Sequence, residues 1–233
     1  MKIINRLGNF IKSKLLELDS KTINSGYNNF LLIKKLISIP ALIYLLNKKK
    51  IDKIDGYLSP GQEFFLLEKA FGLNWNATIV EIGSYKGKST VCLGLGTLYS
   101  NKKIYAIDTF KGGKDFFNFK DNKPYKSGFL SIFKKNIIKL GISKHVQYLV
   151  GRSDEIGRHW NRSIDFLFID ASHLYKDVLT DYKLYAPHVK KGGIIIFHDV
   201  VTEFPGVLRA WKKLKTSLKE PKHFLSFGYG YKK

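Results

Sequence analysis

The sequence predicts an α/β fold built on a doubly wound, mostly parallel sheet. Apolar, β-branched runs alternate along the chain with segments that can form helices. The clearest run, Thr78–Ile82, leads into a glycine-spaced turn, Gly83–Gly87, and then into a segment with helical character, Lys88–Leu98. A second run, Lys103–Asp108, ends in a carboxylate. Ligands of such sheets bind beyond the carboxyl ends of the strands, so the turn and the acid indicate the position of a site.

Most of the other elements follow from apolar patterns and turn residues. Ser59 and Pro60 form a good helix start, with serine as the cap and proline at the first helical position. The predicted helices after that start are Glu63–Phe71, Phe129–Leu140, Ser172–Tyr185 and Glu203–Leu218. The further predicted strands are Val146–Val150, Ile164–Asp170, Gly192–His198 and His223–Tyr231. The alternation of strand and helix thus continues through the second half of the chain.

The length of 233 residues suffices for one α/β domain with a modest extension. We expect a basic helical extension over residues 1–55 and a single domain over residues 56–233. The one cysteine, Cys92, excludes an internal disulfide and favours a reducing compartment. We therefore expect a cytoplasmic protein, with contact at most to the inner face of the membrane.

The formal net charge of +21 favours an anionic partner such as nucleic acid or membrane. Only five of the 40 basic residues are arginine, however. Proteins that read bases or clamp phosphates prefer arginine because its guanidinium forms two parallel hydrogen bonds. We therefore expect a generally basic surface and no nucleic-acid partner.

The N-terminal region contains two segments with helical patterns. Met1–Ser20 is basic and amphipathic, whereas Phe30–Leu46 is more apolar but is interrupted by Pro40 and two lysines and is short for a membrane span. In one interpretation residues 1–50 lie on an anionic membrane surface. In the other they pack on the body of the protein or on a second subunit, which would make a homo-oligomer. We favour packing.

Two motifs carry a resemblance to a known family. Glu81–Thr90 reads EIGSYKGKST, and Ala106–Phe110 reads AIDTF, with Asp108 twenty-one positions after Gly87. Together they resemble the cofactor half of class I S-adenosylmethionine-dependent methyltransferases, and in particular the metal-dependent O-methyltransferases of the catechol and macrocin types. The resemblance covers roughly residues 58–233. It implies a Rossmann-like, mostly parallel seven-stranded sheet with a terminal antiparallel strand, and S-adenosylmethionine as the cofactor.

The resemblance also implies a set of cofactor contacts. Glu81 would help to hold the methionine end, and Asp108 would accept hydrogen bonds from the ribose hydroxyls. Ser153 and Asp154 follow the third strand and would border the adenine ring, although Ser153 would serve equally well as an ordinary helix cap. The residues that we expect to contact the cofactor are Glu81, Gly83, Ser84, Tyr85, Gly87, Ser89, Asp108, Thr109, Ser153 and Asp170.

A metal site is predicted at the ends of two later strands. Asp170 ends one strand, and His198 and Asp199 end the next. Right-handed crossovers make these strands neighbours, so the three side chains would meet and suit Mg²⁺ or Mn²⁺. The resemblance implies the same site, but the family has an acidic or amide residue where this chain has His198. That difference leaves open whether His198 binds the metal or orients Asp199.

His173 is the candidate general base. It lies three positions after Asp170, where the resembling enzymes carry a basic residue that takes the acceptor proton, in the pattern Asp170–Tyr175 (DASHLY). Imidazole accepts protons at physiological pH because its ordinary pKa is near neutral. His173 and Asp170 are the residues expected to carry catalysis. The alternative is that His173 caps a helix or packs against Tyr175.

The function that follows is metal-assisted O-methylation of a hydroxyl on a sugar, glycan or other small molecule. A sugar hydroxyl, and hence a role in polysaccharide biosynthesis, is favoured because macrocin-type enzymes modify sugars. The long polar and aromatic segment Thr109–Lys126 would form part of the acceptor pocket, unless it is merely an insertion. Two alternatives stay open: an RNA or protein methyltransferase steered by positive charge, and a non-catalytic, membrane-associated binding module.

Overall fold

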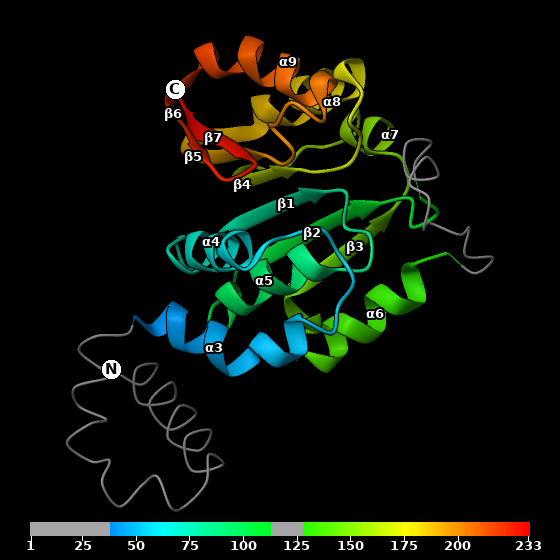
Figure 1. Ribbon diagram of the computed structural model, residues 1–233, viewed down its shortest axis with the longest axis vertical. Helices are drawn as coiled ribbons and strands as arrows, with labels where there is room; N and C mark the ends of the chain where they lie inside the picture. Colours follow the sequence, from blue (N-terminus) through cyan, green and yellow to red (C-terminus); the bar gives the residue numbers. More distant parts are fainter. Residues whose placement is uncertain (1–37, 113–127) are drawn as a thin grey trace, which may run out of the picture.

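The computed structural model describes residues 38–112 and 128–233. It contains a central sheet with helices on both faces (Figure 1). The strands are β1 (Thr78–Ile82), β2 (Lys103–Asp108), β3 (Val146–Val150), β4 (Ile164–Ile169), β5 (Val189–Phe197), β6 (Leu218–Phe224) and β7 (Phe227–Lys232). The helices are α3 (Ile39–Ile51), α4 (Pro60–Phe71), α5 (Lys88–Thr97), α6 (Leu130–Lys139), α7 (Ser153–Gly157), α8 (Tyr175–Tyr185) and α9 (Pro205–Leu214).

The sheet has seven strands in the order β3-β2-β1-β4-β5-β7-β6. Strands β1 to β5 are parallel, and β7 is antiparallel to both of its neighbours. The chain builds outward from β1 to β3 and then returns to the other side of β1 to add β4. This reversal between β1 and β4 is the point at which open α/β sheets bind their ligands. The predicted fold class is therefore confirmed.

Alternate residues of each strand enter two separate cores. On β1, Ile79 packs in the layer formed with α3, α4, α5 and α6, whereas Val80 packs in the layer formed with α8 and α9. On β5, Ile194 and Ile195 divide in the same way. Because both faces of these strands are covered, consecutive apolar residues occur in each, at residues 79–80 of β1 and 194–197 of β5.

The C-terminal prediction was wrong in its detail. Helix α9 ends at Leu214, four residues before the predicted end, and the single strand expected over residues 223–231 is a hairpin of β6 and β7. Leu225, with φ of 54°, lies in the turn between the two strands. Strand β6 is the edge strand, and six of its seven residues are exposed. It therefore lacks the apolar alternation by which a half-buried strand is recognised.

Helix α3 packs on the body of the protein. It begins after Ser38, has Pro40 in its first turn and continues beyond the predicted end to Ile51. Its buried residues Ile43 and Tyr44 belong to the core shared with α4 and α5. Packing, the interpretation that we favoured, therefore holds for this part of the extension. The predicted helix over residues 1–20 lies outside the described residues, among which no helix has the length and apolar character needed to cross a membrane.

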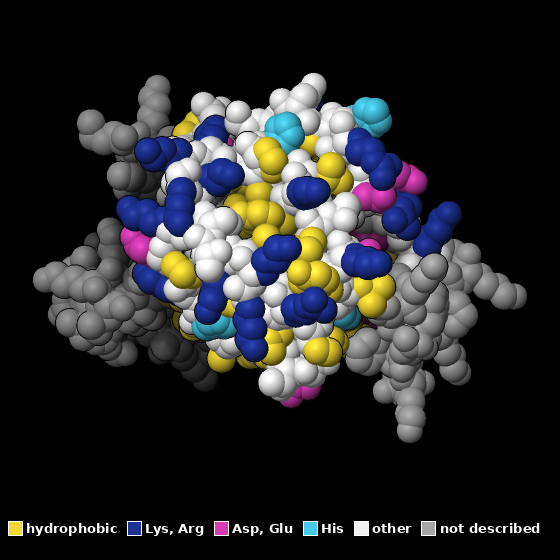
Figure 2. Space-filling model, turned by 90° about the horizontal axis from the view of Figure 1, so that it is seen from above, with side chains coloured by type: hydrophobic (Ala, Val, Ile, Leu, Met, Phe, Trp, Pro, Cys, Tyr) yellow, Lys and Arg dark blue, Asp and Glu magenta, His cyan; other side chains and the backbone are white. Residues whose placement is uncertain are grey.

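The face over α8 and α9 is strongly basic. Figure 2 shows lysine and arginine side chains spread across it, with apolar patches between them and acidic side chains mainly near its margins. The exposed basic residues of α8, α9 and the segment from the end of α9 through β6 are Lys176, Lys183, Arg209, Lys212, Lys213, Lys215, Lys219 and Lys222. These eight residues contribute part of the positive charge expected from composition.

Candidate cofactor and metal site

The glycine turn lies where the strand order reverses. Gly83 has φ of 90°, a conformation that residues with a Cβ rarely adopt. A Cβ on this residue would also lie 2.2 Å from the carbonyl oxygen of Asp170. Only glycine therefore lets the turn after β1 pass so closely over the end of β4. The predicted cofactor turn and the predicted metal ligand Asp170 are direct neighbours in space.

Asp108 holds this turn by its backbone. Oδ2 of Asp108 accepts hydrogen bonds from the backbone N–H groups of Ser84, at 2.8 Å, and Tyr85, at 2.7 Å. Oδ1 accepts from the N–H of Phe110 at 2.6 Å. A carboxylate offers about four acceptor sites, so about one is left for a ligand. To bind both ribose hydroxyls, as predicted, Asp108 would have to release a backbone partner.

Glu81 lies beneath the turn and is fully buried. Its Oε2 accepts hydrogen bonds from the hydroxyl of Ser84, at 2.7 Å, and from the hydroxyl of Thr90. Its Oε1 has no hydrogen-bond partner within the described part of the chain. Burial raises the pKa of Glu81 to about 7, although the hydroxyls of Ser89, Thr90 and Ser84 oppose the shift. An unpaired buried carboxylate oxygen fits a cationic group, such as the ammonium of a methionine moiety.

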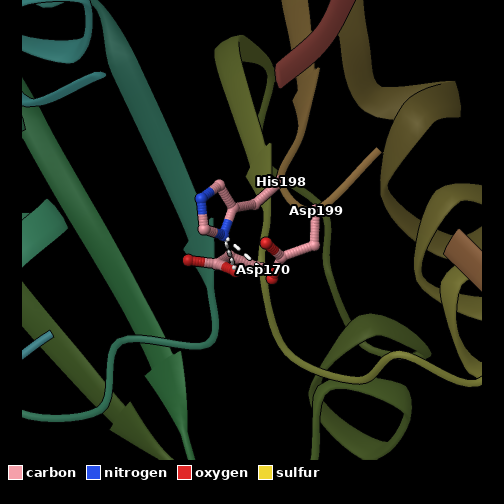
Figure 3. Close-up of side chains that lie close together, drawn as sticks. All are labelled: Asp170, His198 and Asp199. Atoms are coloured by element: carbon pink, nitrogen blue, oxygen red, sulfur yellow. Dashed lines mark hydrogen bonds and ion pairs between the residues drawn. The ribbon is translucent and has the colours of Figure 1, made fainter. Parts of the chain in front are cut away.

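The three predicted metal ligands meet in one small volume. Nδ1 of His198 lies 2.9 Å from Oδ1 of Asp170 and 3.1 Å from Oδ2 of Asp199 (Figure 3). One ligand atom from each residue lies within 4.8 Å of the others. The cause is the register of β4 with β5, which pairs Ile169 with Phe197 and so brings the residues after both strands side by side.

The charges of this group favour a cation at its centre. Burial would lower the pKa of His198, but the carboxylates of Asp170 and Asp199 outweigh it and raise that pKa to about 10. Burial also raises the pKa of Asp170. For Asp199, hydrogen bonds from His173 and His198 overcome the effect of burial and lower the pKa. The two carboxylates therefore share the proton of an imidazolium, and a divalent ion fits the same position by replacing that proton.

His173 is held from two sides. Its Nε2 lies 3.1 Å from Oδ2 of Asp199, and its ring stacks on Phe204 with centroids 4.1 Å apart and planes at 22°. A carboxylate partner favours the tautomer with hydrogen on Nε2, which leaves Nδ1 as the acceptor. Asp199 has φ of 56°, an unusual conformation for a residue other than glycine. Phe204 was missed by the sequence analysis because its contact depends on the fold of the segment before α9.

One alternative role for His173 was packing against Tyr175. Among the described residues, the ring of His173 stacks on Phe204, and no ring contact joins it to Tyr175. It also precedes α8, whose N-cap is Leu174. The predicted helix over residues 172–185 begins only at Tyr175, so His173 lies in the loop between β4 and α8. A loop position at the carboxyl end of the sheet leaves the imidazole available for chemistry.

Ser153 is the first residue of α7, shortly after β3, and does not cap the helix, whose N-cap is Arg152. The hydroxyl of Ser153 hydrogen-bonds to Asp181 of α8, whose pKa burial raises to about 7. Its carbonyl oxygen accepts a hydrogen bond from the hydroxyl of Tyr185 at 2.9 Å. The helix-cap interpretation was therefore wrong, and the adenine contact stays a prediction. Asp154 pairs with two arginines at the surface, and its contact with the adenine ring also stays a prediction.

The remaining predicted contacts are placed in part. Ser89 is buried on the first turn of α5, and Thr109 is half-buried directly after β2. Both lie at the carboxyl edge, as expected. Most of the predicted acceptor segment over residues 109–126 lies outside the described residues. Its flanks meet, because the N–H of Phe129 donates to the carbonyl of Phe110 at 2.7 Å.

The chain is similar to a family of known proteins. A family model described as a methyltransferase domain matches residues 80–200, slightly more than half of the chain. The chain belongs to this methyltransferase family. The matched segment runs from β1 to the residues after β5 and includes both the glycine turn and the Asp170, His198 and Asp199 group.

Three individual proteins similar to this chain share between 16% and 34% of its residues over the aligned regions. An uncharacterized protein of Acanthamoeba polyphaga mimivirus is 34% identical over 131 residues, so the match spans about half the length of this curated relative, 51%, and 52% of this chain. An O-methyltransferase from Bacillus cereus, solved with S-adenosylhomocysteine, is 18% identical with a TM-score of 0.58, over 82% of this chain and 89% of that one. TomG from Streptomyces achromogenes, solved with S-adenosylmethionine, is 16% identical with a TM-score of 0.59, over 83% and 88%. These likenesses establish a shared fold.

Proposed function

We propose that this protein is an S-adenosylmethionine-dependent O-methyltransferase that acts, with the help of a divalent metal, on a hydroxyl of a sugar or another small molecule. The observation that carries the proposal is the convergence of a cofactor-type turn with an Asp–His–Asp group and a carboxylate-bound histidine at one edge of the sheet. Family membership and the shared fold of O-methyltransferases solved with the cofactor or its product support it.

The cofactor would lie along the turn after β1. Glu81 provides an unpaired buried oxygen for its ammonium group, and Asp108 has one acceptor site left for a ribose hydroxyl. Three nearby carboxylates, Glu81, Asp170 and Asp199, also favour the positively charged sulfonium. The bound cofactor supplies the electrophilic methyl group.

The proton of the acceptor would move to His173. With Nε2 bonded to Asp199, Nδ1 is the nitrogen that can take the hydroxyl proton, and Asp199 then stabilises the imidazolium. The oxygen–methyl bond forms as the sulfur–methyl bond breaks, which yields a methyl ether, S-adenosylhomocysteine and protonated His173. Stacking on Phe204 holds the imidazole in one plane during the transfer.

Asp170, His198 and Asp199 would hold the metal. A divalent ion bound there would lower the pKa of an acceptor hydroxyl and orient its oxygen. Because imidazole suits Mn²⁺ and softer ions better than Mg²⁺, His198 shifts the expected preference toward Mn²⁺. Binding should release the proton of His198 and therefore strengthen as the pH rises.

The acceptor class rests on likeness to enzymes that modify sugars. A TDP-rhamnose 3′-O-methyltransferase of calicheamicin biosynthesis shares the fold at 14% identity and a TM-score of 0.53, over 99% of this chain and 93% of that one. A second candidate function, methylation of an anionic macromolecule such as RNA, is favoured by the basic face over α8 and α9 (Figure 2). The same charge keeps peripheral contact with anionic membrane as a proposal, which sedimentation with anionic liposomes would test.

Replacement of His173 by alanine tests the proposal. The expected result is a loss of turnover of roughly 10²-fold or more on a panel of sugar and catechol acceptors, because the general base is removed. Affinity for S-adenosylhomocysteine, measured by calorimetry, should stay unchanged. Asp177→Asn is the matched control. Asp177, on α8, accepts a hydrogen bond from Ser172 in the loop that carries His173, but it does not belong to the group of Asp170, His198 and Asp199. Unchanged turnover in the alanine variant would remove His173 from the mechanism.

A further inference from the structure

Two lysines flank Gly87 in the cofactor turn, and both are paired with carboxylates that precede the matched domain. Nζ of Lys86 lies 2.8 Å from Oδ2 of Asp55, although the lysine side chain is only 6% exposed. Nζ of Lys88 lies 3.4 Å from Oε1 of Glu63. Segment 55–63, between α3 and α4 and into the first turn of α4, therefore neutralises both ammonium groups of the turn.

Glu63 connects three helices at this place. It is buried, with a side chain that is 1% exposed, and its Oε2 also contacts Nζ of Lys48, at 3.3 Å, and the hydroxyl of Tyr44, at 2.8 Å. Lys48 and Tyr44 belong to α3, Glu63 to α4 and Lys88 to the start of α5. A buried carboxylate is tolerated only when it is paired and hydrogen-bonded, so these partners hold one another in place.

The backbone of segment 55–63 also approaches the turn closely. A Cβ on Gly56 would lie 2.8 Å from Cβ of Lys88, so the chain passes directly against the start of α5. The ring of Tyr57 stacks on Tyr85 with centroids 6.2 Å apart and planes at 23°. The ring of Tyr85 also packs edge-on against the ring of Phe129, with centroids 4.6 Å apart. Tyr85 is thus placed by aromatic contacts from two different parts of the chain.

The turn needs this support because its backbone conformation is energetically unfavourable by itself. Tyr85 has φ of 47°, and Gly83 and Gly87 on either side have φ of 90° and 89°. A left-handed residue other than glycine persists only where its surroundings hold it. Asp108 holds the turn from β2, and Asp55 and Tyr57 hold it from segment 55–63.

We propose that segment 55–63 is a working part of the cofactor site, in which Asp55 and Glu63 act as positioning residues that keep the glycine turn in its binding conformation. The inference rests on the proposed function, since it takes the turn to be where the cofactor binds. When a binding-competent conformation is only partly populated, apparent affinity falls by that fraction. Loss of the contacts from segment 55–63 should therefore weaken cofactor binding through the turn, without the removal of any direct contact to the cofactor.

The test uses the full chain and the variant Asp55→Asn, with Glu220→Gln as the matched control. Glu220 is also an exposed partner of lysines, Lys219 and Lys222, but it lies on β6, and no ion pair of the described residues joins it to the turn or to segment 55–63. Calorimetry with S-adenosylhomocysteine should show affinity reduced about fivefold to tenfold in the first variant and unchanged in the second, with recovery in Asp55→Glu. Urea unfolding should stay close to wild type for both variants, because Asp55 is exposed.

Hydrogen exchange of a peptide spanning residues 83–90 provides a second measurement that needs no ligand. Exchange should be faster in Asp55→Asn than in Glu220→Gln. Wild-type affinity in Asp55→Asn would overturn the inference even if exchange changed, and unchanged exchange would overturn the mechanism given for it. If the wild-type protein itself does not bind S-adenosylhomocysteine, the proposed function fails as well, which is a different outcome from failure of the variant alone.

Discussion

The two halves of the site use their carboxylates differently. At the proposed cofactor edge, beside β1 and β2, Glu81 and Asp108 accept hydrogen bonds from hydroxyls and backbone N–H groups. At the proposed metal edge, beside β4 and β5, Asp170 and Asp199 face imidazoles and share a proton with them. The first pair of carboxylates stabilises the conformation of the turn, and the second pair provides negative charge for a proton or a cation.

This difference shows why one short motif does not define a site of this kind. The cofactor edge is assembled almost locally, since Glu81, Ser84 and Thr90 lie within ten residues. The metal edge joins residues twenty-eight positions apart through the pairing of two strands. Substitutions at the first edge should therefore change binding and stability, whereas substitutions at the second edge should change chemistry.

The largest effect is expected from Asp199→Asn. This change removes the charge that orients His173 and one of the two carboxylates around His198, so turnover should fall by about 10³-fold. Affinity for Mn²⁺, measured by calorimetry, should fall as well, while affinity for S-adenosylhomocysteine stays within about twofold. A variant that lost cofactor affinity and kept turnover would break the division between the two edges.

Glu81→Gln should change how stability depends on pH. Because burial raises the pKa of Glu81 from 4.5 to about 7, the native state holds a proton that the unfolded state has lost between those values. The contribution of Glu81 to stability is thus present at low pH and is lost as the pH rises toward 7, by up to about 3 kcal/mol at about 1.4 kcal/mol per unit.

The glutamine variant stays neutral throughout, so its stability relative to wild type should rise between about pH 4.5 and pH 7. Urea unfolding at several pH values measures this difference. Glu68→Gln, at an exposed position on α4, is the control. If the difference in the free energy of unfolding between Glu81→Gln and wild type does not change with pH, the pKa of Glu81 is not raised by burial.

The smallest of these effects is expected from Asp108→Asn. The amide places a donor near the N–H groups of Ser84 and Tyr85, so the turn loses support and affinity for S-adenosylhomocysteine should fall about tenfold. The matched control is Asp165→Asn, because Asp165 of β4 accepts a hydrogen bond from the N–H of Thr78 at 2.8 Å, at the end of β1 opposite to the turn. Equal loss of affinity in both variants would mean that sheet stability, and not the turn, limits binding.

Much of the site was predictable because strand ends are visible in the sequence. Asp108, Asp170, His198 and Asp199 each follow a buried apolar run, and the parallel sheet places such residues at one edge. Phe204 and Asp55 were not predictable in the same way. Their partners, His173 and Lys86, lie thirty-one residues away in sequence, and no local pattern specifies the pairing.

The sequence by itself determined the alternation of strands and helices, the glycine turn and the acids that follow the strands, since apolar period and backbone freedom are local properties. Tertiary structure alone decided that His173 joins the predicted group of Asp170, His198 and Asp199 through a contact with Asp199, and that Asp108 accepts three backbone hydrogen bonds from the turn and the residues after β2. It also decided that segment 55–63 reaches the turn. Those features depend on strand register and on the packing of distant segments, which a linear pattern does not contain.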